Sequence, residues 1–277
     1  MSVINTNIKS LVSQNALKLN NRSLQSAMEQ LSTGKRINSA ADDAAGLAIS
    51  NKMTSQINGL EQAIRNANDG ISLLQTAEGA TKEITNMLQR MRELSVQAAN
   101  DTYSDEDRAS LQIEMDELIE EIDRVGSNTM WNGMYIFAEG IGDAGDISFQ
   151  VGIGGGPEDV ITSTLHPIDA MELGVEGLTV EDHLSATGAL LDIDQAIVTI
   201  DGYRAEYGAK INRLMYAADN AANISLNTSE SRSRILDADY AKASSELART
   251  QIIQQAATAV LAQANTEQQS VLKLLQG

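Results

Sequence analysis

Few residues of this sequence have the types and spacing that chemistry at a site requires. The chain has no cysteine, and its only two histidines, His166 and His183, belong to no H-E-x-x-H or other regular metal-ligand motif. Asp42 and Asp43 would form a carboxylate pair suited to acid–base catalysis, but a helix start also favours acidic residues, because its dipole is positive there. We therefore expect no metal, no cofactor and no enzymatic activity.

A run of three glycines, residues 154–156, is the other candidate ligand site. A phosphate-binding loop continues with Lys and then Ser or Thr, whereas Pro157 and Glu158 follow here and no basic residue lies nearby. We interpret the run as a turn.

The composition excludes two classes of partner. The formal net charge of −18 excludes nucleic acid, because a protein that binds phosphates is normally basic on at least one face. No apolar run approaches the roughly 20 residues of a membrane span, so we expect no membrane insertion. Aromatic residues make up only 3% of the chain, so its core must consist mainly of Leu, Ile, Met and Ala.

The two ends of the chain have apolar residues at helical spacing and are not acidic. Residues 1–36 carry a net charge of +4 and residues 232–277 of +1. The residues that we expect to pack the ends together, and against other copies of the chain, are Ile4, Ile8, Leu11, Leu24, Leu31, Leu247, Leu261, Val271 and Leu275. Leaving such a face exposed forfeits on the order of 10 kcal/mol, comparable to a whole folding stability of about 5–15 kcal/mol. We therefore predict that the ends become ordered only against each other and against neighbouring copies.

The middle of the chain has the heptad spacing of a helical bundle. Apolar residues follow steps of three and four over residues 44–100, 107–125 and 185–221, with two successive steps of three at Leu74, Ala77 and Ala80. We interpret those steps as a local slip in the coiled-coil register. Three such helices form a bundle.

A joint separates the first helix from this bundle. Ser32, Thr33 and Gly34 break the helix, and we expect the next helix to begin near Ser39, capped by Ser39 and Asp42.

Residues 130–184 differ in composition from the rest of the chain. Apolar and polar residues alternate from Ile147 to Ile153, which predicts a strand, and residues 134–138 are its expected partner. The predicted fold is therefore mainly α, a long coiled-coil helical bundle rod with a small β-hairpin region and paired N- and C-terminal helices. The predicted domains are residues 1–44 with 235–277, and a rod of residues 45–234 that includes the hairpin region.

The sequence resembles bacterial flagellin, the subunit of the flagellar filament. The resemblance is carried by VINTNIKSL (3–11), TGKRINSAADDAAGLAIS (33–50), RNANDGISLLQTAEGA (65–80), LQRMRELSVQAAN (88–100), DRASLQIEMDELIEEIDRV (107–125), FQVG (149–152), SRILDADYA (233–241) and QANTEQQSVLKLL (263–275). Because residues 130–184 stand where many members carry large outer domains, the chain resembles a minimal flagellin.

The resemblance implies a structural subunit that polymerises into the filament for swimming motility, with the terminal helices forming the inner tube. It also implies an extracellular destination and export without a cleaved signal peptide. The partners that it implies are other copies of the chain, an export chaperone, and the filament cap and hook-junction proteins. Gln268 stands where many members have Pro, so we expect the last helix to continue without a break.

Host receptors are also implied by the resemblance. The residues that match the motif read by the animal flagellin-sensing Toll-like receptor are Gln89, Arg90, Leu94 and Glu114, which also have a packing role between subunits. The residues of the joint that match the plant-receptor epitope are Gly34, Arg36, Asn38, Asp42, Asp43 and Gly46. Ala41 replaces the Lys that is usual in this epitope.

Other functions remain open from the sequence. A hook–filament junction protein shares the terminal helices, although the rod motifs favour a flagellin. A secreted helical scaffold or binding protein would also have long heptads, but it need not pair its two ends. A filament-displayed enzyme would need a larger insertion than residues 130–184.

Overall fold

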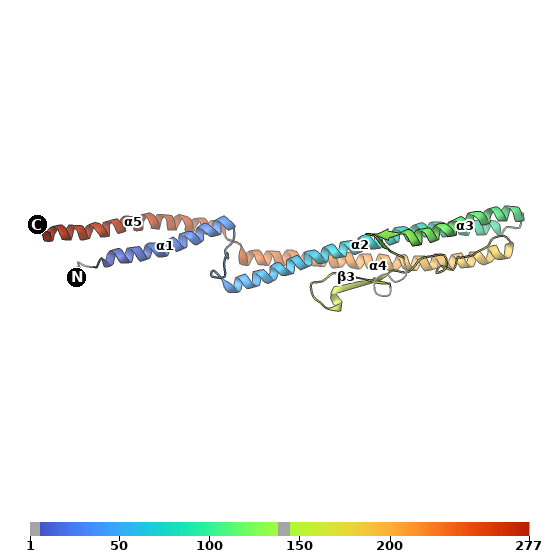
Figure 1. Ribbon diagram of the computed structural model, residues 1–277, viewed down its shortest axis with the longest axis horizontal. Helices are drawn as coiled ribbons and strands as arrows, with labels where there is room; N and C mark the ends of the chain where they lie inside the picture. The colour runs from blue at the N-terminus through green and yellow to red at the C-terminus, as the bar shows by residue number, and fades with distance from the viewer. Residues whose placement is uncertain (1–5, 138–144, 277) are drawn as a thin grey trace. The chain divides into compact units, whose positions relative to one another are not determined.

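The computed structural model describes residues 6–137 and 145–276, with the backbone alone for residues 267–276. The elements are α1 (Ile8–Thr33), α2 (Ala44–Ala98), α3 (Asp105–Asn128), β1 (Met130–Trp131), β2 (Met134–Tyr135), β3 (Asp146–Gln150), η1 (Pro157–Asp159), β4 (Val160–Thr164), α4 (His183–Leu236) and α5 (Tyr240–Gln276) (Figure 1). The prediction of a mainly helical protein with small antiparallel strands is confirmed.

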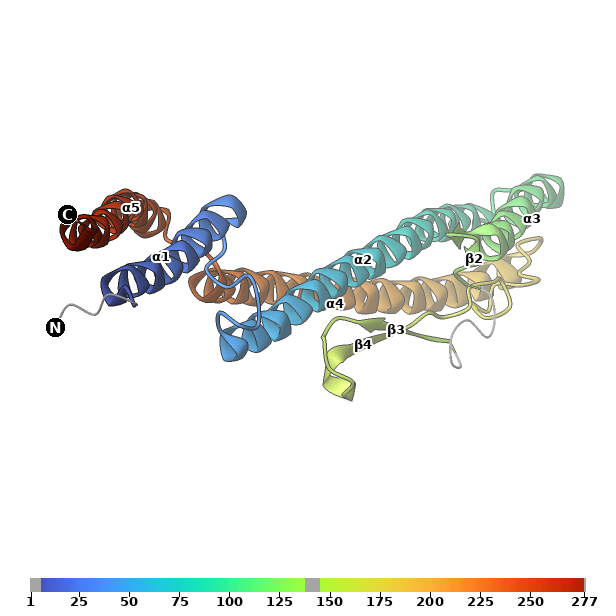
Figure 2. The same ribbon diagram turned by 60° about the vertical axis from the view of Figure 1, so that its left-hand side comes forward.

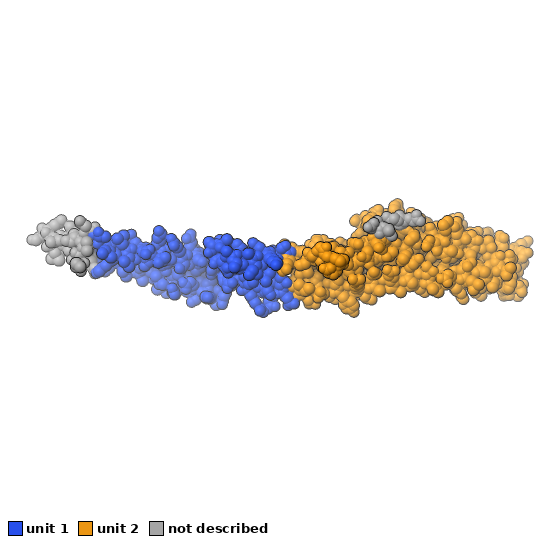
Figure 3. Space-filling view, turned by 90° about the horizontal axis from the view of Figure 1, so that it is seen from below, with its two compact units in different colours: residues 1–55, 227–277 blue, residues 56–226 orange. Residues whose placement is uncertain are grey.

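The chain divides into two compact units, which Figure 3 distinguishes by colour. Unit 1 comprises residues 1–55 and 227–277, and unit 2 comprises residues 56–226. The predicted domain limits, near residues 44 and 235, both lie inside unit 1. The division into a terminal-helix domain and a rod therefore stays a prediction. Among the described residues, no helix is both long enough and apolar enough to cross a membrane.

In unit 1, α1 and α5 lie side by side and antiparallel (Figures 1 and 2). Side-chain amides join them: Asn7 Nδ2 donates to Ala264 O at 3.0 Å, Asn20 Nδ2 donates to Thr250 O at 2.8 Å, and Gln254 Nε2 donates to Asn21 Oδ1 at 3.2 Å. Small and polar residues are buried along the seam, namely Ser10, Asn20, Ala27, Ala243, Thr250 and Ala264. Because small residues bury little apolar area, this seam is weakly hydrophobic for its length.

In unit 2, α2, α3 and α4 pack around one hydrophobic core, which supports the predicted bundle. From Leu60 onward, most buried positions of α2 follow one unbroken register: Leu60, Ala63, Ala67, Gly70, Leu74, Ala77, Thr81, Ile84, Leu88, Met91, Ser95 and Ala98. Leu73, Thr85 and Leu94 are buried beside it. The predicted slip at Ala80 is therefore wrong, because Thr81 takes the core position. Its hydroxyl donates to Ala77 O at 3.0 Å, and this bond within the helix lets a polar residue be buried.

The strands form two separate antiparallel pairs, β1 with β2 and β3 with β4. The predicted strand at residues 147–153 exists as β3, but its partner is β4 and not residues 134–138. Of that expected partner, Met134 and Tyr135 pair with β1 instead, and Ala138 lies outside the described residues. The alternation in ISFQVGI identified the strand, whereas VITST resembles any short polar segment, so its pairing was not evident.

Two glycines of α2 mark where the segment around β3 crosses the helix. A Cβ at Gly70 would lie 2.8 Å from the Phe149 ring, and one at Gly59 would lie 2.8 Å from Ile153 Cγ2. Gly126 of α3 is tighter, since a Cβ there would lie 1.9 Å from the backbone oxygen of Ile168. These glycines permit the segments between α3 and α4 to pack directly on helix backbone.

Helix α4 extends beyond the heptad pattern of residues 185–221. The polar stretch from residue 223 to 234 is helical and belongs to α4. It contains neither Gly nor Pro, and Glu230 and Arg234 form an i,i+4 ion pair. As predicted, α5 runs through residue 268 without a break.

Candidate functional site

Large apolar side chains remain exposed on the α1/α5 pair. Ile8 is 58% exposed, Val12 64% and Val260 57%, although they lie on helices that contact each other. Together with Lys9, Ser13, Gln263 and Ala264, these three residues line a groove of about 400 Å³. A long helix pair with apolar residues outside its own seam has more apolar surface than the two helices can cover.

The structure places the predicted assembly residues in different environments. Ile8 and Leu11 are exposed, while Leu24, Leu31, Leu247 and Leu261 are half-buried. Ile4 lies outside the described residues, as do the side chains of Val271 and Leu275 in α5.

The joint is held by backbone pairing between its two connecting segments. Lys35 and Asp237 form an antiparallel β-bridge, with Arg36 N donating to Leu236 O at 2.7 Å and Ala238 N donating to Gly34 O at 2.9 Å. The Arg36 guanidinium also donates to Ile235 O at 2.7 Å, near the C-terminus of α4, where the helix dipole favours a positive charge. Gly34 has a φ of 70°, the left-handed conformation that ends α1.

The second half of the joint differs from the predicted cap. Ser39 does not begin a helix; instead the Asp42 carboxylate accepts from Ser39 N at 2.8 Å and Asn38 N at 3.1 Å, which closes a turn. These bonds, with one from the Ser39 hydroxyl, lower the pKa of Asp42. The helix starts five residues later than predicted, where Asp43 Oδ1 accepts from Gly46 N at 2.9 Å.

Gly46 is required by close packing. A Cβ at this position would lie 2.5 Å from Asp43 Oδ2 and 2.6 Å from Ile37 Cδ1, and Ile37 is only 2% exposed. We expect Gly46→Ala to destabilise the joint by about 1–3 kcal/mol, because Asp43 or Ile37 must move. Hydrogen exchange at the amide of residue 46 would then be faster than in the parent chain.

Gly79 of α2 is the matched control for Gly46. It also lies in α2, but a Cβ there would meet no atom within 4 Å. Gly79→Ala is therefore expected to raise stability by up to about 1 kcal/mol, and to slow exchange at its own amide. If Gly46→Ala slowed exchange at its amide to the same degree, close packing would not be the reason for Gly46.

The residues that match the animal-receptor motif fall into two groups. On the surface of unit 2, Arg90 Nε donates to Glu114 Oε1 at 2.8 Å and Arg90 Nη1 to Glu93 Oε2 at 3.0 Å, which raises the pKa of Arg90. Gln89 is exposed beside them. Leu94 is only 1% exposed and belongs to the core. The structure brings Arg90 and Glu114 together, but it buries Leu94 in the core.

The two histidines lie at different places in unit 2. The His166 ring stacks on Tyr203 with centroids 4.0 Å apart, and His183 Nδ1 donates to Ala99 O at 2.7 Å. Within residues 6–137 and 145–266, no group of three or more His, Cys, Asp or Glu side chains is arranged to hold a metal ion.

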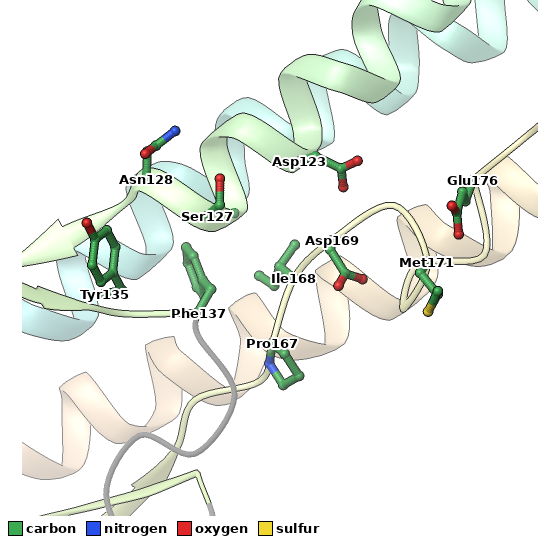
Figure 4. Close-up of a pocket in the computed structure, with 11 residues that line it drawn as sticks. Asp123, Ser127, Asn128, Tyr135, Phe137, Pro167, Ile168, Asp169, Met171 and Glu176 are labelled. Carbon is green, nitrogen blue, oxygen red and sulfur yellow. The ribbon is translucent and has the colours of Figure 1, made fainter.

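An open hollow of about 600 Å³ lies between the end of α3, β2 and the loop before α4 (Figure 4). Its carboxylates hold the loop in place: Asp123 Oδ1 accepts from Ala170 N and Asp169 Oδ1 from Glu172 N, both at 2.7 Å. Figure 4 shows the Phe137 and Ile168 side chains between these elements, where both are buried. The hollow therefore has a packing explanation and no evident catalytic arrangement.

Comparison with known proteins decides the family. The family model described as "Bacterial flagellin N-terminal helical region" matches residues 4–141, and the one described as "Bacterial flagellin C-terminal helical region" matches residues 190–275. The chain belongs to the bacterial flagellin family. The segment between the two matches is short, so this is a minimal-form flagellin.

Similar proteins agree with this assignment along the whole chain. A flagellin from Halalkalibacterium halodurans is 42% identical over 273 residues, with 99% of each chain covered. A "flagellar filament 33 kDa core protein" of Treponema phagedenis is 42% identical over 284 residues, again with 99% of each covered. The crystal structure of Bacillus cereus flagellin matches with a TM-score of 0.50 and 34% identity, covering 57% of this chain and 88% of that one.

Flagellins are structural subunits of the extracellular flagellar filament, and this chain is such a subunit. Family membership confirms the resemblance and the main function that the sequence suggested. It also establishes self-association, since a filament subunit must contact further copies of itself.

The sequence analysis did not identify some residues that join the helices to one another. Arg92 Nε donates to Asp194 Oδ1 at 2.6 Å and joins α2 to α4, as Arg90 joins α2 to α3. Asn20 breaks the apolar pattern of α1 but supplies the buried bond to Thr250. In the sequence, Asn20 is a polar residue at a position where an apolar one is expected. Such a residue can equally be an interruption of the heptad pattern with no bonding role.

Proposed function

We propose that the α1/α5 pair is the part of this flagellin that forms the inner tube of the filament and becomes fully ordered on assembly. The observation that carries this proposal is the set of large apolar residues exposed on the pair, including Ile8, Val12 and Val260. The weakly hydrophobic seam supports it, because ordering each residue costs roughly 1–2 kcal/mol, and small seam residues offset little of that cost. Neighbouring copies would supply the missing contacts.

Polymerisation of the purified chain is the direct test. After seeding with filament fragments or salting-out, negative-stain microscopy is expected to show filaments, and hydrogen exchange in α1 and α5 should slow strongly in them. Filaments in which α1 and α5 exchange as fast as in the monomer would contradict the role given to the ends.

Recognition by the animal receptor is a further part of the proposal. Gln89, Arg90 and Glu114 form an exposed polar cluster on unit 2, and Arg90 is the residue most suited to paired hydrogen bonds across an interface. Leu94 would contribute by supporting this surface from the core, since it is 1% exposed.

Arg90→Asp is expected to reduce signalling in a receptor reporter-cell assay by at least about tenfold, because truncating a charged interface residue costs about 2–5 kcal/mol. Arg124→Asp is the matched control, as Arg124 is also exposed and also bonds a glutamate, Glu121. Undiminished signalling by the Arg90 variant, or an equal loss in the control, would remove Arg90 from the recognition surface.

The joint is the proposed epitope of the plant receptor. Within it Gly34, Asp42 and Asp43 are exposed, while Ile37 is buried and Arg36 is bonded to Ile235. Ala41 is exposed where the family usually has Lys, so we expect weaker recognition than for a chain with Lys at this position.

The remaining partners follow from the family and are proposed for this chain as a whole. They are a chaperone for the C-terminal segment, a cap at the growing tip and the hook-junction proteins, with export without a cleaved signal peptide. We propose no enzymatic activity.

A further inference from the structure

Helix α4 has two apolar faces, of which only one is covered within unit 2. The first face packs in the core and repeats every seven residues: Ala186, Ile193, Ile200, Tyr207 and Leu214 are each buried. A second series begins two residues earlier, at Leu184, Leu191 and Val198. An offset of two residues is about 200° around a helix, so the second series lies on the opposite side.

This second face, which we call the outer stripe, continues with steps of three and four along much of α4. Its residues are Leu184, Gly188, Leu191, Gln195, Val198, Gly202, Ala205, Ala209, Asn212 and Tyr216. Every one of them is exposed, with Leu184 at 81%, Leu191 at 71% and Tyr216 at 75%.

The outer stripe carries no charged residue, although 21% of the chain is charged. Charges stand immediately beside it on α4, at Asp192, Asp201 and Arg213. A helix face that served only to meet water would normally carry charged side chains.

Two glycines of the outer stripe make no close contact with the described residues of the subunit. A Cβ at Gly188 or at Gly202 would meet nothing within 4 Å, in contrast to Gly46, Gly59 and Gly70. Glycine is among the least favourable residues in a helix interior, and neither position has a left-handed backbone or a close intramolecular contact to justify it. Such glycines permit the close approach of another chain's backbone. Unlike Gly79, Gly188 and Gly202 stand one helical turn from exposed apolar side chains, Leu191 and Val198.

A second copy of this chain is the occupant that fits the outer stripe. Each copy has a formal charge of −18, so two copies meet with least repulsion where neither presents charge. The stripe is roughly 50 Å long at about 1.5 Å per residue, which suits a partner that is itself a long helix. With a width of about 10 Å, it buries roughly 500 Å² per copy, less than the roughly 800 Å² typical of a stable pair. A contact of this size is suited to a polymer in which several contacts add together.

We propose that the outer stripe of α4 is a subunit-to-subunit contact of the filament, with Gly188 and Gly202 as the points of closest approach. The proposal rests on the filament function given above. It adds a rod contact to the one proposed for the terminal helices.

The double variant Gly188→Gln with Gly202→Gln tests the proposal without removing any intramolecular contact. The monomer is expected to melt at the same temperature as the parent chain or higher, because Gln is a better helix former than Gly. In seeded polymerisation, the concentration needed for filament growth should rise at least tenfold. The matched control is Gly79→Gln, since Gly79 lies in α2 among polar residues and is equally open. It should polymerise as the parent chain does.

The outcomes separate this proposal from the function on which it rests. If the parent chain forms no filaments under any seeding condition, both fail. If the parent forms filaments and the double variant grows at the same concentration, or the Gly79 control is equally impaired, the stripe assignment alone is overturned.

A second measurement identifies the occupant. Because the chain has no cysteine, Leu191→Cys introduces a single thiol in the stripe, and Glu120→Cys places one on the exposed acidic face of α3. In filaments of the purified chain only another copy can cover position 191. Maleimide labelling of that thiol is therefore expected to slow at least tenfold on assembly, while labelling at position 120 serves as the reference. Equal labelling at position 191 in monomer and filament overturns the proposal.

Discussion

A chain that lacks residues 1–36 is expected to remain monomeric where the full-length chain forms filaments. The deletion removes α1 together with its exposed residues Ile8, Leu11 and Val12. It also removes the side-chain bonds to α5 that Asn7 and Asn20 donate and that Asn21 accepts from Gln254. Helix α5 then loses the helix that it packs against, and an isolated helix is only marginally stable in water.

The same deletion is expected to leave unit 2 folded, because the core of α2, α3 and α4 contains no residue of α1. Circular dichroism should therefore show a large loss of helix from α1 and α5, with one cooperative melting transition retained. Sedimentation and negative-stain microscopy measure assembly. Filament formation by the truncated chain would refute the role assigned to the ends.

A milder change separates the apolar face from the presence of the helix. In the full-length chain, Ile8→Asn with Val12→Asn removes two side chains that are 58% and 64% exposed. Helicity of the monomer should stay close to that of the parent chain, while polymerisation weakens. Loss of helix comparable to the deletion would mean that these residues stabilise α1 within the subunit and do not serve assembly.

Leu94→Ala is expected to lower the unfolding free energy by about 2–5 kcal/mol, because it leaves a cavity in a well-packed core. Leu94 is 1% exposed and lies among the core residues of α2. For a unit of this size the melting temperature should fall by roughly 5–15 °C. Calorimetry or denaturant titration of the monomer measures the change.

The comparison with Leu88→Ala shows how Leu94 serves receptor recognition. Leu88 is 0% exposed in the same helix, and the receptor motif does not include it. If Leu94 only supports the surface that carries Arg90, both alanine variants should lose a similar amount of signalling for a similar loss of stability. A markedly larger loss for Leu94→Ala would show direct contact with the receptor and contradict the packing explanation.

The sequence predicted the helices well because their signals are local. The end of α1 follows from the break expected at Ser32, Thr33 and Gly34, and the structure ends the helix there. The joint shows the limit of such signals. Ser39 and Asp42 form the expected hydrogen bond, but it closes a turn, and Asp43 is the residue that caps α2.

The register of α2 could not be settled from apolar residues alone. Gly70, Thr81 and Ser95 occupy core positions that a hydrophobic pattern leaves blank. Thr81 and Ser95 satisfy their hydroxyls by bonding to carbonyls four residues earlier, and the space beside Gly70 is occupied by the ring of Phe149. The bonds of Thr81 and Ser95 form only when the segment is already helical, and the neighbour of Gly70 is a residue distant in sequence.

By itself the sequence determined the family, the helical composition, the joint and the pairing of the two ends. These follow from long motifs and from periodicity, which need no knowledge of the contacts. The tertiary structure decided which of those residues are buried and which are exposed for contact with a partner. It buried Leu94 while leaving Arg90 exposed, paired β3 with β4, and left the glycines of α4 open while Gly59 and Gly70 of α2 are covered. Exposure depends on the packing of several segments at once, and no local pattern contains that information.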